Sequence, residues 1–171
     1  DDAETKNRLA TIYRAAMADF VGRARTTAVE DTIDRTSEAQ QRIARSVAHL
    51  AENMERVPVL CVPIVAGRTD GNGAEDHRER TNTFWQAGRW GSVIPALWSF
   101  MLALRSRGLG SAWTTLTLLR EAEVAEVLSI PYDDWMQVGL FPVAHTIGTE
   151  FRIPPRRPAA ELIRWNGYRS N

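Results

Sequence analysis

The side chains best suited to nucleophilic, acid–base or metal chemistry are few and widely spaced in this sequence. His49, His77 and His145 share no metal-ligand spacing, and no Gly-x-Ser-x-Gly or dinucleotide-binding glycine motif occurs. Cys61 is the single cysteine and lies in an apolar run, which favours an inert buried thiol over a nucleophile. The sequence therefore gives little support to catalysis by side chains of its own.

Composition restricts the class of protein further. The chain has 171 residues, 44% of them hydrophobic, which is enough for one core and predicts a single domain over residues 1–171. Its 21 basic residues balance 21 acidic ones, so we expect neither nucleic acid nor membrane as a partner. One cysteine, no long apolar stretch and an acidic start predict a soluble protein of the reducing cytoplasm.

Two amphipathic helices are expected in the first third of the chain. Apolar residues recur at helical spacing over residues 4–20, where Asp1 or Asp2 can cap the start. A second helix is expected to run from a capping box at Ser37 and Gln40 to about Glu55.

The most apolar helix is expected in the middle of the chain. Ser92 and Pro95 are suited to a cap and an early-turn proline, and apolar residues follow to Leu104. Gly108 and Gly110 can take left-handed conformations and end this helix. A short helix over 121–128 should then close at Ile130-Pro131.

Strands are expected on either side of that helix. The run 57–66 is β-branched and apolar, which predicts a strand covered on both faces with a local break at Pro63. Residues 135–143 predict a second strand, and 111–115 a short strand or turn. Residues 68–82 are polar and predict a surface loop, a candidate lid, and the tail predicts one helical turn at 159–165. Two strands cannot form a stable sheet, so a further strand or a second chain must complete it.

Five segments in the second half of the chain together form a recognisable pattern. They are Gly91-Ser-Val-Ile-Pro-Ala96, the apolar helix, Gly108-Leu-Gly-Ser-Ala-Trp113-Thr-Thr, Ile130-Pro131 and Arg156-Arg157-Pro158. In this order and at these intervals they resemble the FMN-dependent nitroreductase family. The resemblance covers about residues 3–165 and is strongest over 91–158.

The resemblance implies an α+β fold with a central mixed or antiparallel sheet flanked by helices. It also implies an intertwined homodimer that binds two FMN molecules at its interface, which would account for the incomplete sheet. The family has an arginine-rich phosphate-binding segment before its first strand, and this sequence begins after that point. We therefore expect the domain to be N-terminally incomplete.

The resemblance also implies the positions of the flavin contacts. Arg156 and Arg157 match basic residues that meet the ribityl phosphate, for which guanidinium groups are well suited; a solvated turn is the alternative. Ser111, Ala112, Trp113 and Thr114 match the stretch beside the isoalloxazine, although Trp113 could equally be a core aromatic. Ser92 and Ile94 match a region that flanks the flavin across the interface, or are a helix cap and a core residue.

The implied reaction is carried by the flavin. Hydride would come from NADH or NADPH and pass to a nitroaromatic, a quinone or a similar small acceptor, with ping-pong kinetics. The alternatives are a flavin-free dimeric binding module, or a divergent member that dehalogenates, oxidises peptide-derived rings or consumes the flavin itself. A cofactor-independent enzyme with Cys61 as nucleophile is a further alternative.

Overall fold

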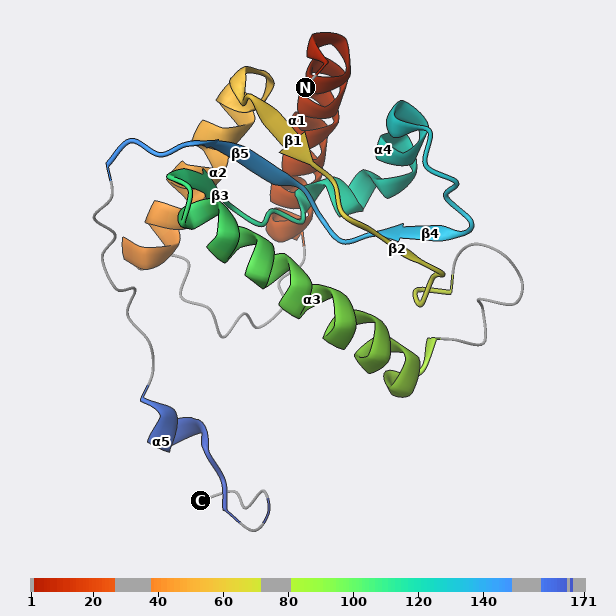
Figure 1. The fold of residues 1–171 in the computed structure, drawn as a ribbon, viewed down its shortest axis with the longest axis vertical. Coiled ribbons are helices and arrows are strands. Elements are labelled where there is room, and N and C mark those ends of the chain that lie inside the picture. The colour runs from red at the N-terminus through yellow and green to blue at the C-terminus, as the bar shows by residue number, and fades with distance from the viewer. Residues whose placement is uncertain (1, 27–37, 72–80, 149–157, 166, 168–171) are drawn as a thin grey trace.

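A computed structural model describes residues 2–26, 38–71, 81–148, 158–165 and 167 (Figure 1). The structure contains both helices and short antiparallel strands, which confirms the expected α+β class. The elements are α1 (Ala3–Thr26), α2 (Glu38–Asn53), η1 (Met54–Arg56), β1 (Val59–Cys61), β2 (Ile64–Ala66), α3 (Thr83–Arg105), β3 (Leu109–Ser111), η3 (Leu116–Arg120), α4 (Glu121–Leu128), β4 (Trp135–Gln137), β5 (Phe141–His145) and α5 (Ala159–Leu162).

Both expected N-terminal helices form. The side chain of Asp2 accepts a hydrogen bond from the Thr5 amide at 2.7 Å, which confirms the cap and lowers the pKa of Asp2. Leu9, Tyr13 and Ala16 are buried at helical spacing, so the apolar face of α1 is its core face. Ser37 of the expected capping box lies outside the described residues.

The expected strand over 57–66 is divided at Val62-Pro63. Residues before the break pair with β5, and residues after it pair with β4, both antiparallel. Proline has no N–H for the ladder, so Pro63 is where the chain moves from one sheet to the other. The expectation that this strand is covered on both faces is wrong, because Val59 and Ile64 are 43% and 39% exposed.

The strands form two small sheets. The first has the order β1-β5-β3 and the second pairs β2 with β4. The single strand expected over 135–143 is two strands, because Gly139 adopts a φ of 143° between β4 and β5. That conformation suits glycine alone and redirects the chain from one sheet to the other.

The cap of the central helix lies ten residues earlier than expected. Asn82 caps it through a 3.2 Å hydrogen bond from the Trp85 amide, so α3 starts at Thr83, not at Ser92. Ser92 and Pro95 both lie inside the helix. Gly108 has the expected left-handed φ of 73°, whereas Gly110 lies in β3.

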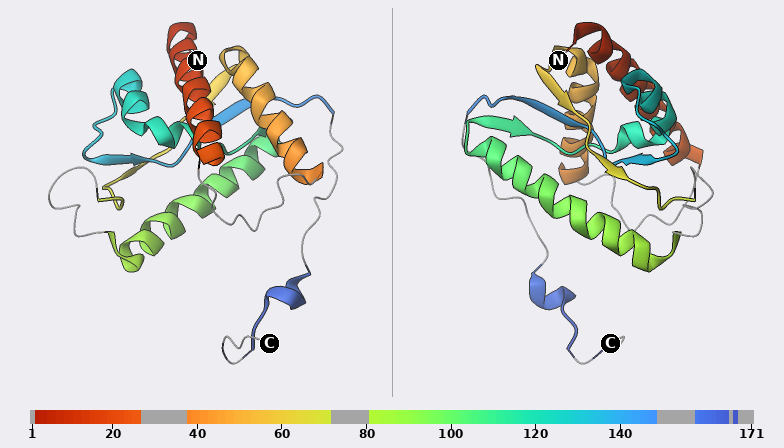
Figure 2. Two further views of the ribbon diagram at one scale, coloured as in Figure 1. Left: turned by 180° about the vertical axis from the view of Figure 1, so that it is seen from behind. Right: turned by 45° about the vertical axis from the view of Figure 1, so that its right-hand side comes forward.

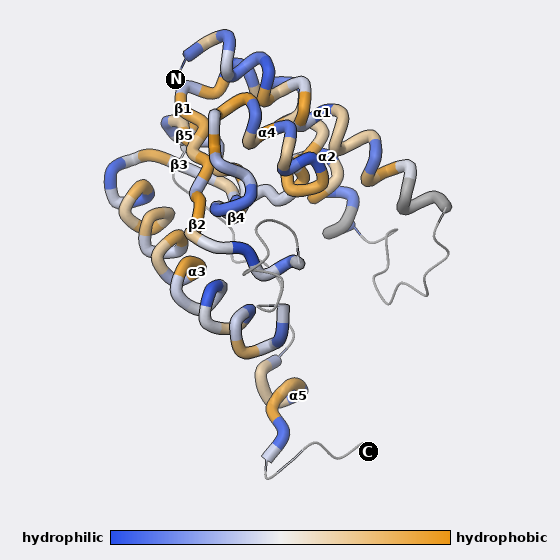
Figure 3. Tube along the Cα trace, turned by 90° about the vertical axis from the view of Figure 1, so that its right-hand side faces the viewer, coloured by the Kyte–Doolittle hydropathy of each residue, from blue (hydrophilic) through white to orange (hydrophobic). Residues whose placement is uncertain are grey.

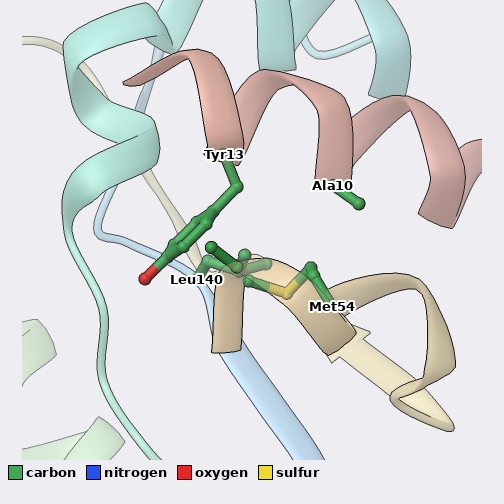
Figure 4. Close-up of a cluster of buried hydrophobic side chains, with 5 residues drawn as sticks. Ala10, Tyr13, Met54 and Leu140 are labelled. Carbon is green, nitrogen blue, oxygen red and sulfur yellow. The ribbon is translucent and has the colours of Figure 1, made fainter. Parts of the chain in front are cut away.

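The helices lie on different sides of the strands. Figures 1 and 2 show α1, α2 and α4 on one side and α3 on the other. The main core lies under α1 and consists of Ala10, Tyr13, Ala51, Met54 and Leu140 (Figure 4). None of the residues of α3 is buried, although many are apolar (Figure 3). The side of this long apolar helix that faces away from the strands therefore has no covering layer among the described residues.

The polar run after β2 is not wholly a surface loop. Arg68 and Thr69 are each only 1% exposed, which corrects the expectation for the start of the 68–82 segment. Residues 72–80, the body of the candidate lid, lie outside the described residues. The predicted helical turn in the tail is α5, which ends at Leu162 and is exposed throughout.

Arg68 is a buried cation with a full set of acceptors. Its guanidinium pairs with both carboxylate oxygens of Asp70 and of Glu121, and donates to the carbonyl oxygens of Tyr132 and Trp135 at 3.0 and 2.9 Å. It also lies over the Tyr132 ring, 4.1 Å from the centroid. Hydrogen bonds to the two carboxylates raise the pKa of Arg68 despite its burial. Arg68 thus joins the end of β2, the start of α4 and β4.

Candidate functional site

The segment 111–115 leaves β3 and is fixed to the core by Thr114. The backbone N–H of Thr114 donates to the Leu140 carbonyl at 3.0 Å, and the Leu140 N–H donates to the Thr114 carbonyl at 2.9 Å. The hydroxyls of Thr114 and Tyr13 share a hydrogen bond of 3.0 Å. Both the backbone and the side chain of Thr114 are therefore held.

Tyr13 reaches this segment from the far side of the core. Its ring is fully buried beside Leu140 and Met54, and its hydroxyl points out of that cluster (Figure 4). Burial raises the pKa of Tyr13, so the phenol stays neutral and hydrogen-bonded at physiological pH. The helical spacing of apolar residues over 4–20 includes Tyr13 but gives no sign of this contact.

Trp113 is fixed on one side and open on the other. Its indole N–H donates to the Val138 carbonyl at 3.0 Å. The ring stacks on Phe141 with centroids 6.0 Å apart and an interplanar angle of 13°, and Phe141 meets the edge of Phe100 from α3. Trp113 nevertheless stays 40% exposed. Trp113 is thus packed on one face, as a core aromatic would be, and accessible on the other, as a ligand contact would be.

Gly139 makes room for this arrangement. A Cβ added there would lie 2.5 Å from the indole nitrogen of Trp113 and 2.8 Å from the Thr114 carbonyl oxygen. An isolated glycine within a strand pattern is the signal that could have indicated such a close approach from the sequence.

We expect Gly139→Ala to displace Trp113 and to lower the free energy of unfolding by about 2 kcal/mol through strain and steric clash. Urea denaturation monitored by circular dichroism measures the loss. Gly22→Ala is the control, because an added Cβ there meets nothing within 4 Å in α1. Equal stability of the two variants would contradict the role of Gly139.

Two polar groups of the segment have no partner among the described residues. The hydroxyl oxygen of Ser111 is buried without a hydrogen bond. The backbone N–H of Thr115 has no acceptor, and the side chains of Ala112 and Thr115 are exposed. Polar groups without a partner close in sequence to an exposed aromatic ring are features that a binding site for a flat molecule with polar edge atoms requires.

The remaining predicted site residues lie elsewhere. Ser92 is exposed in α3, where its hydroxyl donates to the Arg89 carbonyl, and Ile94 is 37% exposed. Phe100 is the α3 residue that contacts Phe141, the stacking partner of Trp113. Ser92 lies about 12 Å from Phe100 along the helix axis. One chain therefore does not bring Ser92 to Trp113. Arg156 and Arg157 lie outside the described residues.

Other groups give no metal centre or membrane span in the described part of the chain. No three histidine, cysteine, aspartate or glutamate side chains there gather as metal ligands. No described helix has the combination of length and apolar character that crossing a bilayer requires.

Cys61 is a half-buried thiol in β1, and burial raises its pKa. It is therefore protonated at neutral pH, which makes it a poor nucleophile. We expect Cys61→Ser to leave turnover unchanged and alkylation of the wild-type thiol to accelerate only as pH rises above neutrality. A rate that falls by more than about tenfold in Cys61→Ser would restore the cysteine hypothesis.

Comparison with known families matches the model of the nitroreductase family to residues 1–145. The chain belongs to the nitroreductase family. A comparison with curated proteins found no match. Membership identifies the protein as an oxidoreductase from a family that generally uses flavin. The resemblance drawn from the glycine-ended helix and its neighbouring motifs is thereby confirmed.

The site geometry is compatible with the flavin that the nitroreductase family uses. An isoalloxazine is a flat ring system with polar atoms on one edge and needs apolar contact together with hydrogen-bond partners. The open face of Trp113 offers the first, and the Ser111 hydroxyl and the Thr115 N–H offer the second. The donor set of segment 111–115 therefore fits a flavin ring.

Proposed function

We propose that this protein is an FMN-dependent oxidoreductase that takes hydride from NADH or NADPH and reduces a small acceptor by a ping-pong mechanism. The observation that carries the proposal is segment 111–115, which Thr114 fixes to the core. The segment contains an exposed indole and two polar groups without a partner among the described residues. FMN, when bound, supplies reversible acceptance and donation of hydride.

The residues of the chain hold and orient the cofactor in this proposal. Tyr13 and Leu140 keep Thr114 in place, so that the neighbouring Thr115 N–H has a fixed direction toward the ring edge. Such a fixed donor would stabilise negative charge on a bound flavin without a reorganisation cost. The Ser111 hydroxyl provides a second hydrogen bond, and Trp113 excludes water from the ring face. No general acid or base of the protein is required.

The proposed assembly is a homodimer built on α3. Ile94, Trp98 and Leu102 follow one another at four-residue spacing and are 37%, 61% and 53% exposed. Side chains at this spacing share one helix face, and a contiguous exposed apolar stripe marks an interaction surface. Covering it with a second chain would bring Ser92 and Ile94 of one subunit toward segment 111–115 of the other.

Arg156 and Arg157 are proposed to bind the FMN phosphate. Their planar donor groups match phosphate oxygens in a bidentate manner. In Arg157→Ala we expect FMN to bind about tenfold or more weakly, while riboflavin, which lacks the phosphate, binds with unchanged affinity. Equal losses for the two flavins would contradict the phosphate role.

Visible absorbance of the purified full-length protein tests the cofactor. A yellow protein that releases FMN on denaturation, and whose colour bleaches when NADH or NADPH is added without oxygen, is the expected result. Nitroaromatic or quinone addition should then restore the colour. A protein that stays colourless with excess FMN would favour a flavin-free dimeric binding module instead.

A further inference from the structure

A hollow of about 450 Å³ lies on the first turns of α3, away from segment 111–115 of the same chain. It is lined by Phe84, Trp85, Ala87, Gly88, Arg89 and Ser92. The Phe84 and Trp85 rings meet edge to face at 5.3 Å and remain 75% and 40% exposed. A Cβ at Gly88 would meet nothing within 4 Å, so the space above it is open.

Arg89 is the charged group of this hollow and has no acceptor among the described residues. Within the described part of the chain no hydrogen bond or ion pair involves its guanidinium, and α3 carries no acidic residue. The side chain is half-buried and packs on the end of β2, where a Cβ added to Gly67 would lie 2.7 Å from a terminal nitrogen. A half-buried guanidinium without an acceptor is uncommon, because charge-assisted hydrogen bonds are among the strongest that side chains make.

The hollow has a rigid base. The side-chain amide of Gln86 donates to the Thr69 carbonyl at 2.9 Å and its oxygen accepts from the Trp90 indole at 3.0 Å. The bond to Thr69 fixes the first turns of α3 to the buried residues that follow β2, and the bond from Trp90 holds the Gln86 side chain in place. Arg89 is therefore held in one place relative to the aromatic pair, as a binding group must be.

We infer that this hollow binds a flat aromatic anion, whose ring contacts Phe84 and Trp85 and whose carboxylate pairs with Arg89. An exposed aromatic pair offers apolar and edge-to-face contact, and a guanidinium binds a carboxylate with two parallel hydrogen bonds. The hollow is too small for a macromolecule and has a single cation, so nucleic acid is a poor fit. The larger hollow between α1 and α4 contains three carboxylates and lacks aromatic residues.

The role of this ligand rests on the proposed function: an aromatic carboxylate would be the class of acceptor that the oxidoreductase prefers. The binding itself requires neither turnover nor flavin reduction. Calorimetric titration of the full-length protein with 4-nitrobenzoate and with its neutral counterpart 4-nitrobenzamide therefore tests the hollow separately from the chemistry.

We expect 4-nitrobenzoate to bind about tenfold more tightly than 4-nitrobenzamide. Arg89→Gln should abolish this preference and leave amide binding unchanged. Arg107→Gln, the same charge change at an exposed residue just after the C-terminal end of α3, should retain it. Gly88→Leu should weaken both probes by filling the hollow. Gly22→Leu, in open space on α1, should weaken neither.

Three results would overturn the inference. They are equal affinity of the wild-type protein for both probes, an Arg89→Gln variant that keeps the preference, and a wild-type protein that binds neither probe because a second copy covers the hollow. A yellow, reducible protein without charge preference would reject the hollow and keep the proposed function. A colourless protein that prefers 4-nitrobenzoate would support the hollow and reject the proposed function.

Discussion

Arg68→Met is expected to lower the free energy of unfolding by about 3–5 kcal/mol, because the cation leaves buried acceptors behind. Methionine retains much of the side-chain volume but none of the donors. Glu121, whose side chain is 11% exposed, would then carry an uncompensated charge, and two backbone carbonyls would lose their partner. A domain is stable by only about 5–15 kcal/mol, so much of the total would be lost.

Urea denaturation of Arg68→Met beside Arg14→Met measures this effect. Arg14 pairs with Glu55 at 3.0 Å, but both side chains are largely exposed, at 44% and 35%. An exposed ion pair contributes less than about 1 kcal/mol, so the Arg14 variant should be nearly as stable as the wild type. Similar small losses in both variants would contradict the structural role of Arg68.

Trp98→Glu is expected to weaken the proposed homodimer by about a hundredfold, because large aromatic residues at the centre of an interface dominate its energy. Trp98 is the middle residue of the exposed stripe on α3, and a carboxylate there would be desolvated on association. Since the flavin site is proposed to need both subunits, FMN should be lost together with the dimer.

Light scattering coupled to size exclusion measures the oligomeric state, and visible absorbance in the same fractions measures bound FMN. Phe20→Glu is the matched control, because Phe20 is 55% exposed on α1, on the other side of the strands. A Trp98→Glu protein that remains dimeric and yellow would show that α3 is not the interface. A Phe20→Glu protein that dissociates would place the interface on α1.

Elements set by local sequence were the ones that could be predicted. The apolar spacing of α1 and the short pattern of α4 each depend on residues within a few turns, and both helices form as expected. The break at Pro63 also follows from the residue itself. The start of α3 was misplaced because Ser92 and Pro95 look like a helix start, whereas Asn82 provides the cap further upstream.

Features that depend on long-range contacts could not be predicted in the same way. Arg68 lies in a polar run that reads as a loop, and its partner Glu121 is 53 residues away. The bond between Tyr13 and Thr114 joins residues 101 positions apart. For the site itself, motif order indicated segment 111–115, but the groups that hold it came only from the structure.

Anaerobic titration of the purified full-length protein with NADH and with NADPH, after release and identification of any bound flavin, tests the central claim most directly. FMN bound in proportion to the protein, bleached by at least one nicotinamide and reoxidised by a nitroaromatic or quinone, is the predicted result. A folded protein that takes up no FMN from excess, or whose bound FMN no nicotinamide reduces, would contradict it.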